Sequence, residues 1–108
     1  MNFAEYQEKA ISTAFYTDGV KVMYPALGLA GEVGEVCNKI KKIFRDNDGE
    51  VTIDMRLKLH KELGDALWYM AALANDLELS LQAIAEDNLS KLAGRKERGT
   101  LHGSGDDR

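Results

Sequence analysis

The sequence predicts an all-α protein, an antiparallel bundle of four helices joined by short connections. Apolar residues recur at intervals of three and four along most of the chain, which is the period of a helix that buries one face. The 108 residues contain a single proline, and short connections favour antiparallel neighbours. This length suits one domain with a core of its own.

The first two helices have recognisable beginnings. Asn2 can cap a helix with Glu5 as its reciprocal partner, and the apolar period that follows extends to about Tyr16. Pro25 suits the first position of a second helix, where its missing N–H is not needed. This second helix is expected to extend to about Phe44.

The third and fourth helices begin at side chains that can cap them. Thr52 or Asp54 can cap the third helix, which extends to about Leu79, and Ser80 can cap a fourth that ends near residue 93. Residues 94–108 hold four glycines and four basic side chains. We therefore expect a helical domain of residues 1–93 followed by a flexible, basic, Gly-rich tail of residues 94–108.

Two pairs of acidic residues share one spacing on successive helices. Glu32 and Glu35 border the apolar stripe of the second helix, and Glu62 and Asp65 repeat this arrangement on the third. Residues three apart are neighbours on one helix face, so antiparallel packing can bring the four carboxylates together. Like charges repel at such distances, whereas Mg²⁺ or Mn²⁺, which prefer oxygen ligands, would stabilise them.

An ordinary solvated face is the alternative interpretation of these acids. Acidic residues on exposed helices commonly pair with a lysine four positions away, and three such pairs are available: Glu35–Lys39, Lys58–Glu62 and Lys61–Asp65. The second helix also contains Gly28, Gly31 and Gly34. Each interior glycine costs ~0.5–1 kcal/mol relative to alanine, so three of them indicate the close approach of a helix or a ligand.

Charge and composition exclude several classes of function. The chain has 18 acidic and 14 basic residues and a net charge of −4, which argues against a nucleic-acid surface. The lone Cys37 excludes an intramolecular disulfide and suits a reducing compartment. No apolar run approaches the ~20 residues of a membrane span, and no signal-peptide pattern opens the sequence. We therefore expect a soluble, cytoplasmic protein with no membrane or nucleic-acid partner.

The segments around the acidic pairs resemble the MazG-like all-α nucleoside triphosphate pyrophosphohydrolases. The resemblance rests on residues 28–35, Gly-Leu-Ala-Gly-Glu-Val-Gly-Glu, and residues 61–69, Lys-Glu-Leu-Gly-Asp-Ala-Leu-Trp-Tyr. Residues 87–92 and 98–106 are similar to downstream segments of small single-domain members. The resemblance covers nearly the whole chain, although Gly31 stands where some relatives carry a further glutamate.

The resemblance implies a MazG-like bundle that cleaves an NTP or dNTP to the monophosphate and pyrophosphate. It implies that Glu32, Glu35, Glu62 and Asp65 hold Mg²⁺, or Mn²⁺, and promote attack of water on the α-phosphorus. Family members form tetramers, or dimers in some branches, so we expect a homotetramer or a homodimer. Two alternatives stay open: a non-catalytic helical module that assembles with itself or a partner, and a pyrophosphohydrolase that acts on phosphoribosyl-ATP or dUTP.

Candidate substrate contacts lie downstream of the acidic pairs. Asn88 and Lys91 share a face of the fourth helix and can contact phosphate, and Arg95 and Arg98 can do so through their guanidinium groups. Trp68 can stack on a nucleobase, although aromatic residues at helical spacing more often belong to the core.

Overall fold

The computed structural model describes residues 1–108 and consists of helices and connections. In chain order the helices are α1 (Phe3–Ile11), a short 3₁₀ helix η1 (Asp18–Val20), α2 (Met23–Asn47), α3 (Ile53–Asp76) and α4 (Leu81–Arg98). The all-α class and its four α-helices are confirmed. None of the helices has the continuous apolar stretch that a membrane span needs, despite the length of α2 and α3.

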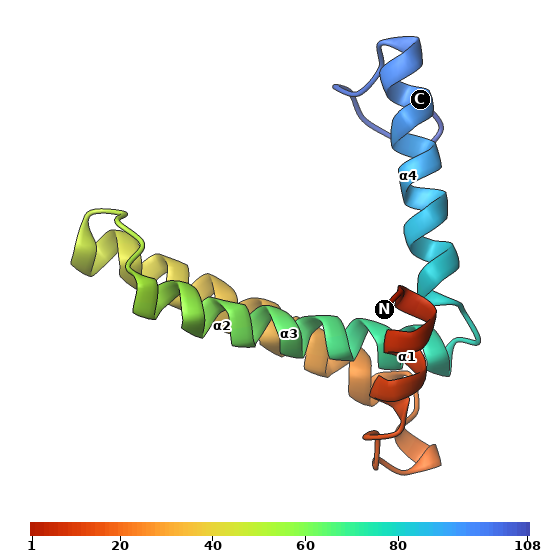
Figure 1. The fold of residues 1–108 in the computed structure, drawn as a ribbon, viewed down its shortest axis with the longest axis horizontal. Helices are drawn as coiled ribbons and strands as arrows, with labels where there is room; N and C mark the ends of the chain where they lie inside the picture. Colours follow the sequence, from red (N-terminus) through yellow and green to blue (C-terminus); the bar gives the residue numbers. More distant parts are fainter.

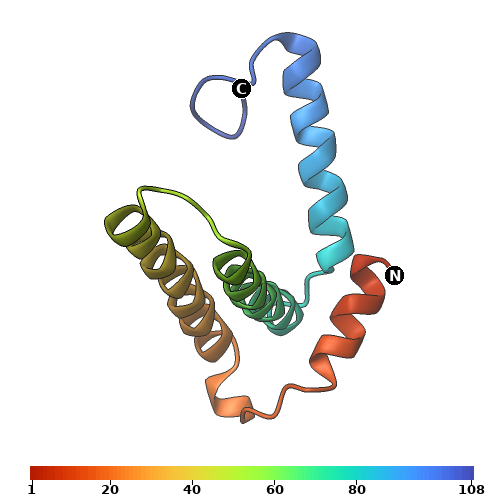
Figure 2. The same cartoon turned by 60° about the vertical axis from the view of Figure 1, so that its left-hand side comes forward.

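The antiparallel pair α2–α3 dominates the molecule (Figures 1 and 2). α1 packs across the C-terminal half of α3, and α4 leaves the pair at a steep angle (Figure 1). Gln7 of α1 joins these elements, because its amide donates to the carbonyl of Leu79 and accepts from the N–H of Leu81. Because α4 leaves the α2–α3 pair, the four helices do not close around one interior within a single chain.

The core of one chain is small. α1, α3 and the first turn of α4 meet at Ala10, Ala71 and Leu81. Only nine residues are buried, and four of them are alanines of α3. Most of the long apolar side chains consequently keep part of their surface exposed to solvent.

The caps of three helices are those the sequence predicts. An N–H of the first turn donates to the capping side chain in each case: Glu5 to Asn2 at 2.8 Å, Met55 to Thr52 at 3.2 Å, and Ala83 to Ser80 at 3.1 Å. Each bond satisfies one of the N–H groups that a helix start leaves without a partner.

The expected end of the first helix at Tyr16 is wrong, because α1 ends at Ile11. The hydroxyls of Ser12 and Thr13 donate to carbonyls of the preceding turn, which competes with continued helix. The expected end of the third helix also shifts, since α3 ends at Asp76 rather than at Leu79.

The expected start of the second helix at Pro25 is wrong by two residues, because α2 begins at Met23. A contact distant in sequence sets this start. The Oδ2 atom of Asp76 accepts from the N–H of Val22 at 2.9 Å and from the hydroxyl of Tyr16 at 2.7 Å. Val22 has a φ of 66°, which a β-branched residue rarely adopts, so this tertiary bond holds a strained helix start.

α4 continues past the boundary expected after residue 93 and ends at Arg98. Gly99, with a φ of 72°, provides the left-handed cap. Basic residues in the last turn also favour the longer helix, because they interact well with its dipole. The expected boundary of domain and tail thus lies inside α4, and residues 99–108 curl back beside it (Figure 2).

Candidate functional site

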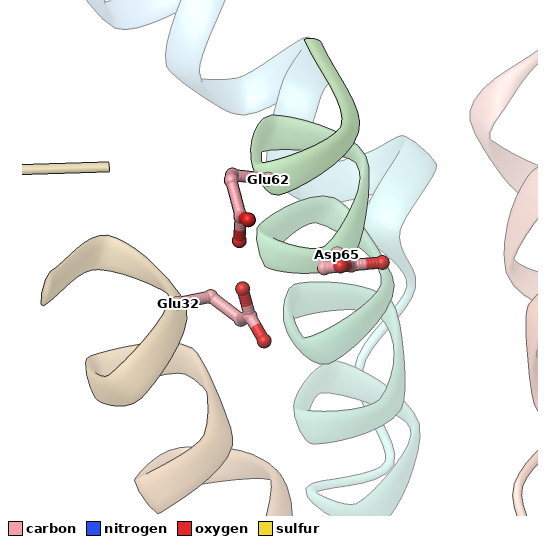
Figure 3. A group of neighbouring side chains, drawn as sticks. All are labelled: Glu32, Glu62 and Asp65. Carbon is pink, nitrogen blue, oxygen red and sulfur yellow. The ribbon is translucent and has the colours of Figure 1, made fainter. Parts of the chain in front are cut away.

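Three of the four predicted acidic residues meet between α2 and α3. Glu32 projects from α2 toward α3, which carries Glu62 and Asp65 (Figure 3). One carboxylate oxygen of each residue lies within 4.8 Å of the other two. Glu32 and Glu62 are half-buried and Asp65 is exposed, so solvent can reach the group.

Glu32 has the most perturbed environment of the three. Its pKa is raised, mainly by a shared hydrogen bond with the Glu62 carboxyl, then by burial and by the negative charges of Asp65, Glu62 and Glu35. Its Oε2 atom is buried and has no hydrogen-bond partner. Below the ordinary pKa of glutamate, Glu32 is protonated and its environment costs the folded chain no stability. As pH rises from there through the raised pKa, the free energy of unfolding falls, because the carboxylate must then carry its charge among the other acids. A cation that replaced the proton would reverse that loss.

Glu35 lies at the edge of the acidic group. It follows Glu32 by one turn of α2 and is exposed. Its charge contributes to the raised pKa of Glu32, but its carboxylate is not among the three that converge.

Lys39 contacts the acids across the helix pair. Its Nζ atom lies 3.7 Å from Oε1 of Glu62, and the within-helix pairs expected for Glu35, Glu62 and Asp65 are not formed. The solvated-face alternative instead pairs Lys39 with Glu35 on its own helix. Its spacing of seven residues from Glu32, two helical turns, is the signal that places it on the acidic side.

A groove of about 270 Å³ between α2 and α3 continues from Lys39 away from the acids. Its lining is Lys39, Lys42, Ile43, Asp46, Met55, Lys58 and Leu59. Three of these seven side chains end in ammonium groups, which is a local excess of positive charge in a chain whose net charge is −4. The groove therefore offers a series of cations that begins beside the carboxylates, at Lys39, and extends away from them.

An aromatic pocket of about 390 Å³ lies on the other side of the acids. Its lining is Val20, Met23, Tyr24, Leu27, Gly28 and Tyr69. Tyr69 follows Asp65 by one helical turn, and Gly28 precedes Glu32 by one turn, so pocket and acids share one helix interface. The ring of Tyr24 stacks on Tyr16 at 4.7 Å and tilts against Tyr69 at 6.3 Å. The spacing of four from Tyr24 to Gly28 to Glu32 could have revealed this pocket.

The sequence model of the MazG nucleotide pyrophosphohydrolase domain matches residues 25–100, which include the acidic group and all residues that line the lysine groove. The chain belongs to the MazG nucleotide pyrophosphohydrolase family. It is also similar to the Gene 37 protein of Mycobacterium phage L5, with 47% identity over 109 residues that cover 95% of this chain and 96% of that protein. No solved structure matches the chain.

MazG proteins generally use divalent metals, and the acidic group of this chain fits such an ion. All donors are carboxylate oxygens, which suit hard cations. The buried Oε2 atom of Glu32 has no hydrogen-bond partner within the chain, and the neighbouring acids and burial raise the pKa of this residue, so a bound cation would satisfy the oxygen and lower that pKa.

The other predicted site residues of this MazG chain lie apart from the acids. Trp68 packs under α1, where its Nε1 donates to the carbonyl of Ala10 at 3.2 Å and to Oγ1 of Thr13 at 2.8 Å. Tyr69, its neighbour, instead faces the pocket. Asn88, Lys91, Arg95 and Arg98 belong to α4, and this helix leaves the α2–α3 pair at a steep angle (Figure 1). Within one chain they are not brought to the acidic group.

Proposed function

We propose that this chain is a Mg²⁺-dependent nucleoside triphosphate pyrophosphohydrolase that cleaves an NTP or dNTP to the monophosphate and pyrophosphate. The observation that supports it best is the convergence of Glu32, Glu62 and Asp65 from two helices. Carboxylates on an ordinary solvated face would point into water rather than toward one another, because their mutual repulsion has no compensation there.

In this proposal Glu32, Glu62 and Asp65 hold the metal, with Glu35 as a fourth candidate and with Mn²⁺ as the alternative ion. A bound Mg²⁺ would supply Lewis acidity to the phosphate oxygens and to the attacking water. Water oxygen forms a bond to the α-phosphorus while the bond from that phosphorus to the α–β bridging oxygen breaks. Pyrophosphate leaves with the bridging oxygen, and a carboxylate of the group accepts the proton of the water.

The order of the pockets along α2–α3 suggests how the nucleotide lies. The base would enter the aromatic pocket and stack on Tyr24 or Tyr69, since π-faces stack on any base. The β- and γ-phosphates would extend past Lys39 into the groove, where Lys42 and Lys58 compensate their charge. The α-phosphorus then lies at the acids, which is where cleavage to the monophosphate requires it.

We further propose that the chain works as a homo-oligomer, a tetramer or a dimer. Its accessible surface is 7948 Å² and its radius of gyration is 16.9 Å, against about 6,000 Å² and about 13 Å for a compact chain of this size. The surplus of about 2,000 Å² exceeds the ~800 Å² that each partner contributes to an ordinary interface. Leu63 and Met70 of α3 and Leu77, the residue that follows its last turn, are spaced by seven and are all exposed, and they suit a helix of a second copy.

Such an assembly gives α4 a role in the site. Asn88 and Lys91 of one subunit would contact the phosphates bound at the acids of another, with Arg95 and Arg98 further along the helix. Sedimentation of Met70→Glu tests the assembly: we expect smaller particles than for the wild type. Phe15→Ser, which changes an exposed apolar residue outside this face, is the control and should leave the assembly intact. An unchanged particle size for Met70→Glu would exclude this face.

Incubation with a panel of NTPs and dNTPs, with and without Mg²⁺, tests the enzyme. We expect monophosphate and pyrophosphate only with metal, and ¹⁸O from labelled water only in the monophosphate. Orthophosphate and a diphosphate would refute the proposed site of cleavage. Inclusion of phosphoribosyl-ATP and dUTP tests the related activity, and no product from any substrate would favour the non-catalytic module.

A further inference from the structure

Residues 99–108, called the C-terminal hook below, are attached to α4 by polar contacts. The guanidinium group of Arg108 donates to three carbonyls of the hook, those of Thr100 at 3.0 Å, Leu101 at 3.1 Å and Gly105 at 2.5 Å. Arg98 of α4 donates to the carbonyl of Arg108 at 2.8 Å. Leu101 is the only large apolar side chain of the hook and is 43% exposed. The hook is therefore held by charge and hydrogen bonds, which salt weakens, and not by an apolar core.

Two cations of α4 converge on one carboxylate of the hook. The Oδ1 atom of Asp106 lies 3.3 Å from Nζ of Lys91 and 3.5 Å from Nη2 of Arg95. Both cations lower the pKa of Asp106, and Lys91 has the larger effect. Arg95 also donates to the carbonyls of Gly105 at 3.3 Å and Asp106 at 2.9 Å. Asp107, the next residue, makes no such contact.

The hook satisfies Arg95 incompletely. This side chain is only 5% exposed, yet its Nε atom is buried without an acceptor. Arginine presents its donors in a planar fork that matches the oxygens of a phosphate, and lysine adds a point charge. Three oxygens of the hook thus contact Arg95 and one of them also contacts Lys91, as the oxygens of an oxyanion would.

We propose that Asp106 is an internal ligand of Lys91 and Arg95, which are assigned above to phosphate contact, and that a pyrophosphate or triphosphate group displaces it. A pyrophosphate has more oxygens and more charge than one carboxylate, so it can satisfy both cations and the Nε atom of Arg95. The inference rests on the proposed use of Lys91 and Arg95 for phosphate contact, but not on hydrolysis at the acids.

Calorimetric titration with inorganic pyrophosphate in the presence of EDTA tests the site without metal or catalysis. Asp106→Asn should bind pyrophosphate roughly three- to tenfold more tightly than the wild type, because two partly exposed ion pairs no longer compete. Asp107→Asn removes the same charge from the neighbouring position and should differ little from the wild type. Equal affinity of the two variants, or weaker binding by Asp106→Asn, would overturn the proposal.

A second variant separates this site from the lysine groove of α2–α3. Lys91→Gln should lose most of the pyrophosphate affinity and should abolish the gain from Asp106→Asn when the two are combined. Pyrophosphate binding that ignores Lys91→Gln would locate the ligand elsewhere and overturn the proposal. A non-hydrolysable triphosphate analogue, titrated in parallel, distinguishes free pyrophosphate from a nucleotide as the ligand by its relative affinity.

Displacement of the hook has its own readout. Trypsin should cut the bond between Arg98 and Gly99 faster when pyrophosphate is present, and Asp106→Asn should be cut fast without it. Protection by pyrophosphate would show a hook that closes over the ligand, contrary to the proposal. Failure of NTP hydrolysis alone would leave these outcomes unaffected, so the two proposals fail separately.

Discussion

Alanine substitution of the α2 glycines should change stability in opposite directions at Gly28 and at Gly31 or Gly34. A Cβ atom at Gly28 would lie 2.1 Å from Cε1 of Tyr69, whereas none of the packed atoms lies within 4 Å of a Cβ at Gly31 or Gly34. Ordinary contacts begin near 3.4 Å, so the Tyr69 ring would have to move by more than one ångström. Overpacking of this size costs about 1–3 kcal/mol.

Replacing a glycine inside a helix with alanine increases the stability of the fold by about 0.5–1 kcal/mol where the new methyl group meets no other atom. Gly31→Ala and Gly34→Ala should therefore stabilise the chain by that amount, and Gly28→Ala should destabilise it by about 1–2 kcal/mol. Urea unfolding followed by circular dichroism, at one protein concentration, measures all three. In a Tyr69→Ala background the cost of Gly28→Ala should disappear, since the clashing ring is gone. Stabilisation by Gly28→Ala in the wild-type background would refute the close approach of the two helices.

Three further outcomes follow from the charges. Glu32→Gln should raise the melting temperature of the metal-free protein and remove its stabilisation by Mg²⁺; a Mg²⁺-insensitive wild type would contradict the metal site. Lys39→Met should bind Mg²⁺ more tightly in calorimetry, because a competing cation is gone, and unchanged affinity would remove Lys39 from the site. Burial and the bond to Asp76 raise the pKa of Tyr16 to about 12, so stability should fall as pH rises from 10 toward 12. Alkaline melts of Tyr16→Phe should show a smaller loss, with the remainder due to Tyr6 and Tyr69, whose pKa values burial also raises.

The parts of this fold that sequence could predict are those determined within one or two helical turns. The caps at Asn2, Thr52 and Ser80 are local side-chain bonds. The meeting of Glu32 with Glu62 depends only on helical spacing and an antiparallel pair. Both features follow from the helix period and the connection lengths, so they can be predicted without knowledge of distant contacts.

Features that depend on contacts distant in sequence could not be predicted. The start of α2 is set by Asp76, more than fifty positions away from Val22. Lys39 pairs across the helix interface with Glu62 instead of with Glu35 on its own helix. The hook depends on Arg95, whose local sequence is that of an ordinary solvated helix end. In each case the partner is selected by how elements distant in sequence pack against each other, and the local sequence does not reveal it.

The position of the acids on α2–α3 explains why the site and the assembly are expected to depend on each other. The core that α1 adds lies at one end of α3, around Ala71, and the acids lie further along the pair. The acids are flanked by the close approach of Gly28 to Tyr69 on one side and by the Lys39–Glu62 pair on the other. Repulsion among the carboxylates opposes that contact until a cation is present. Burial of the exposed apolar side of α3 against a second copy would add the stabilisation that one chain lacks, so loss of assembly should weaken metal binding even though no ligand of the metal changes.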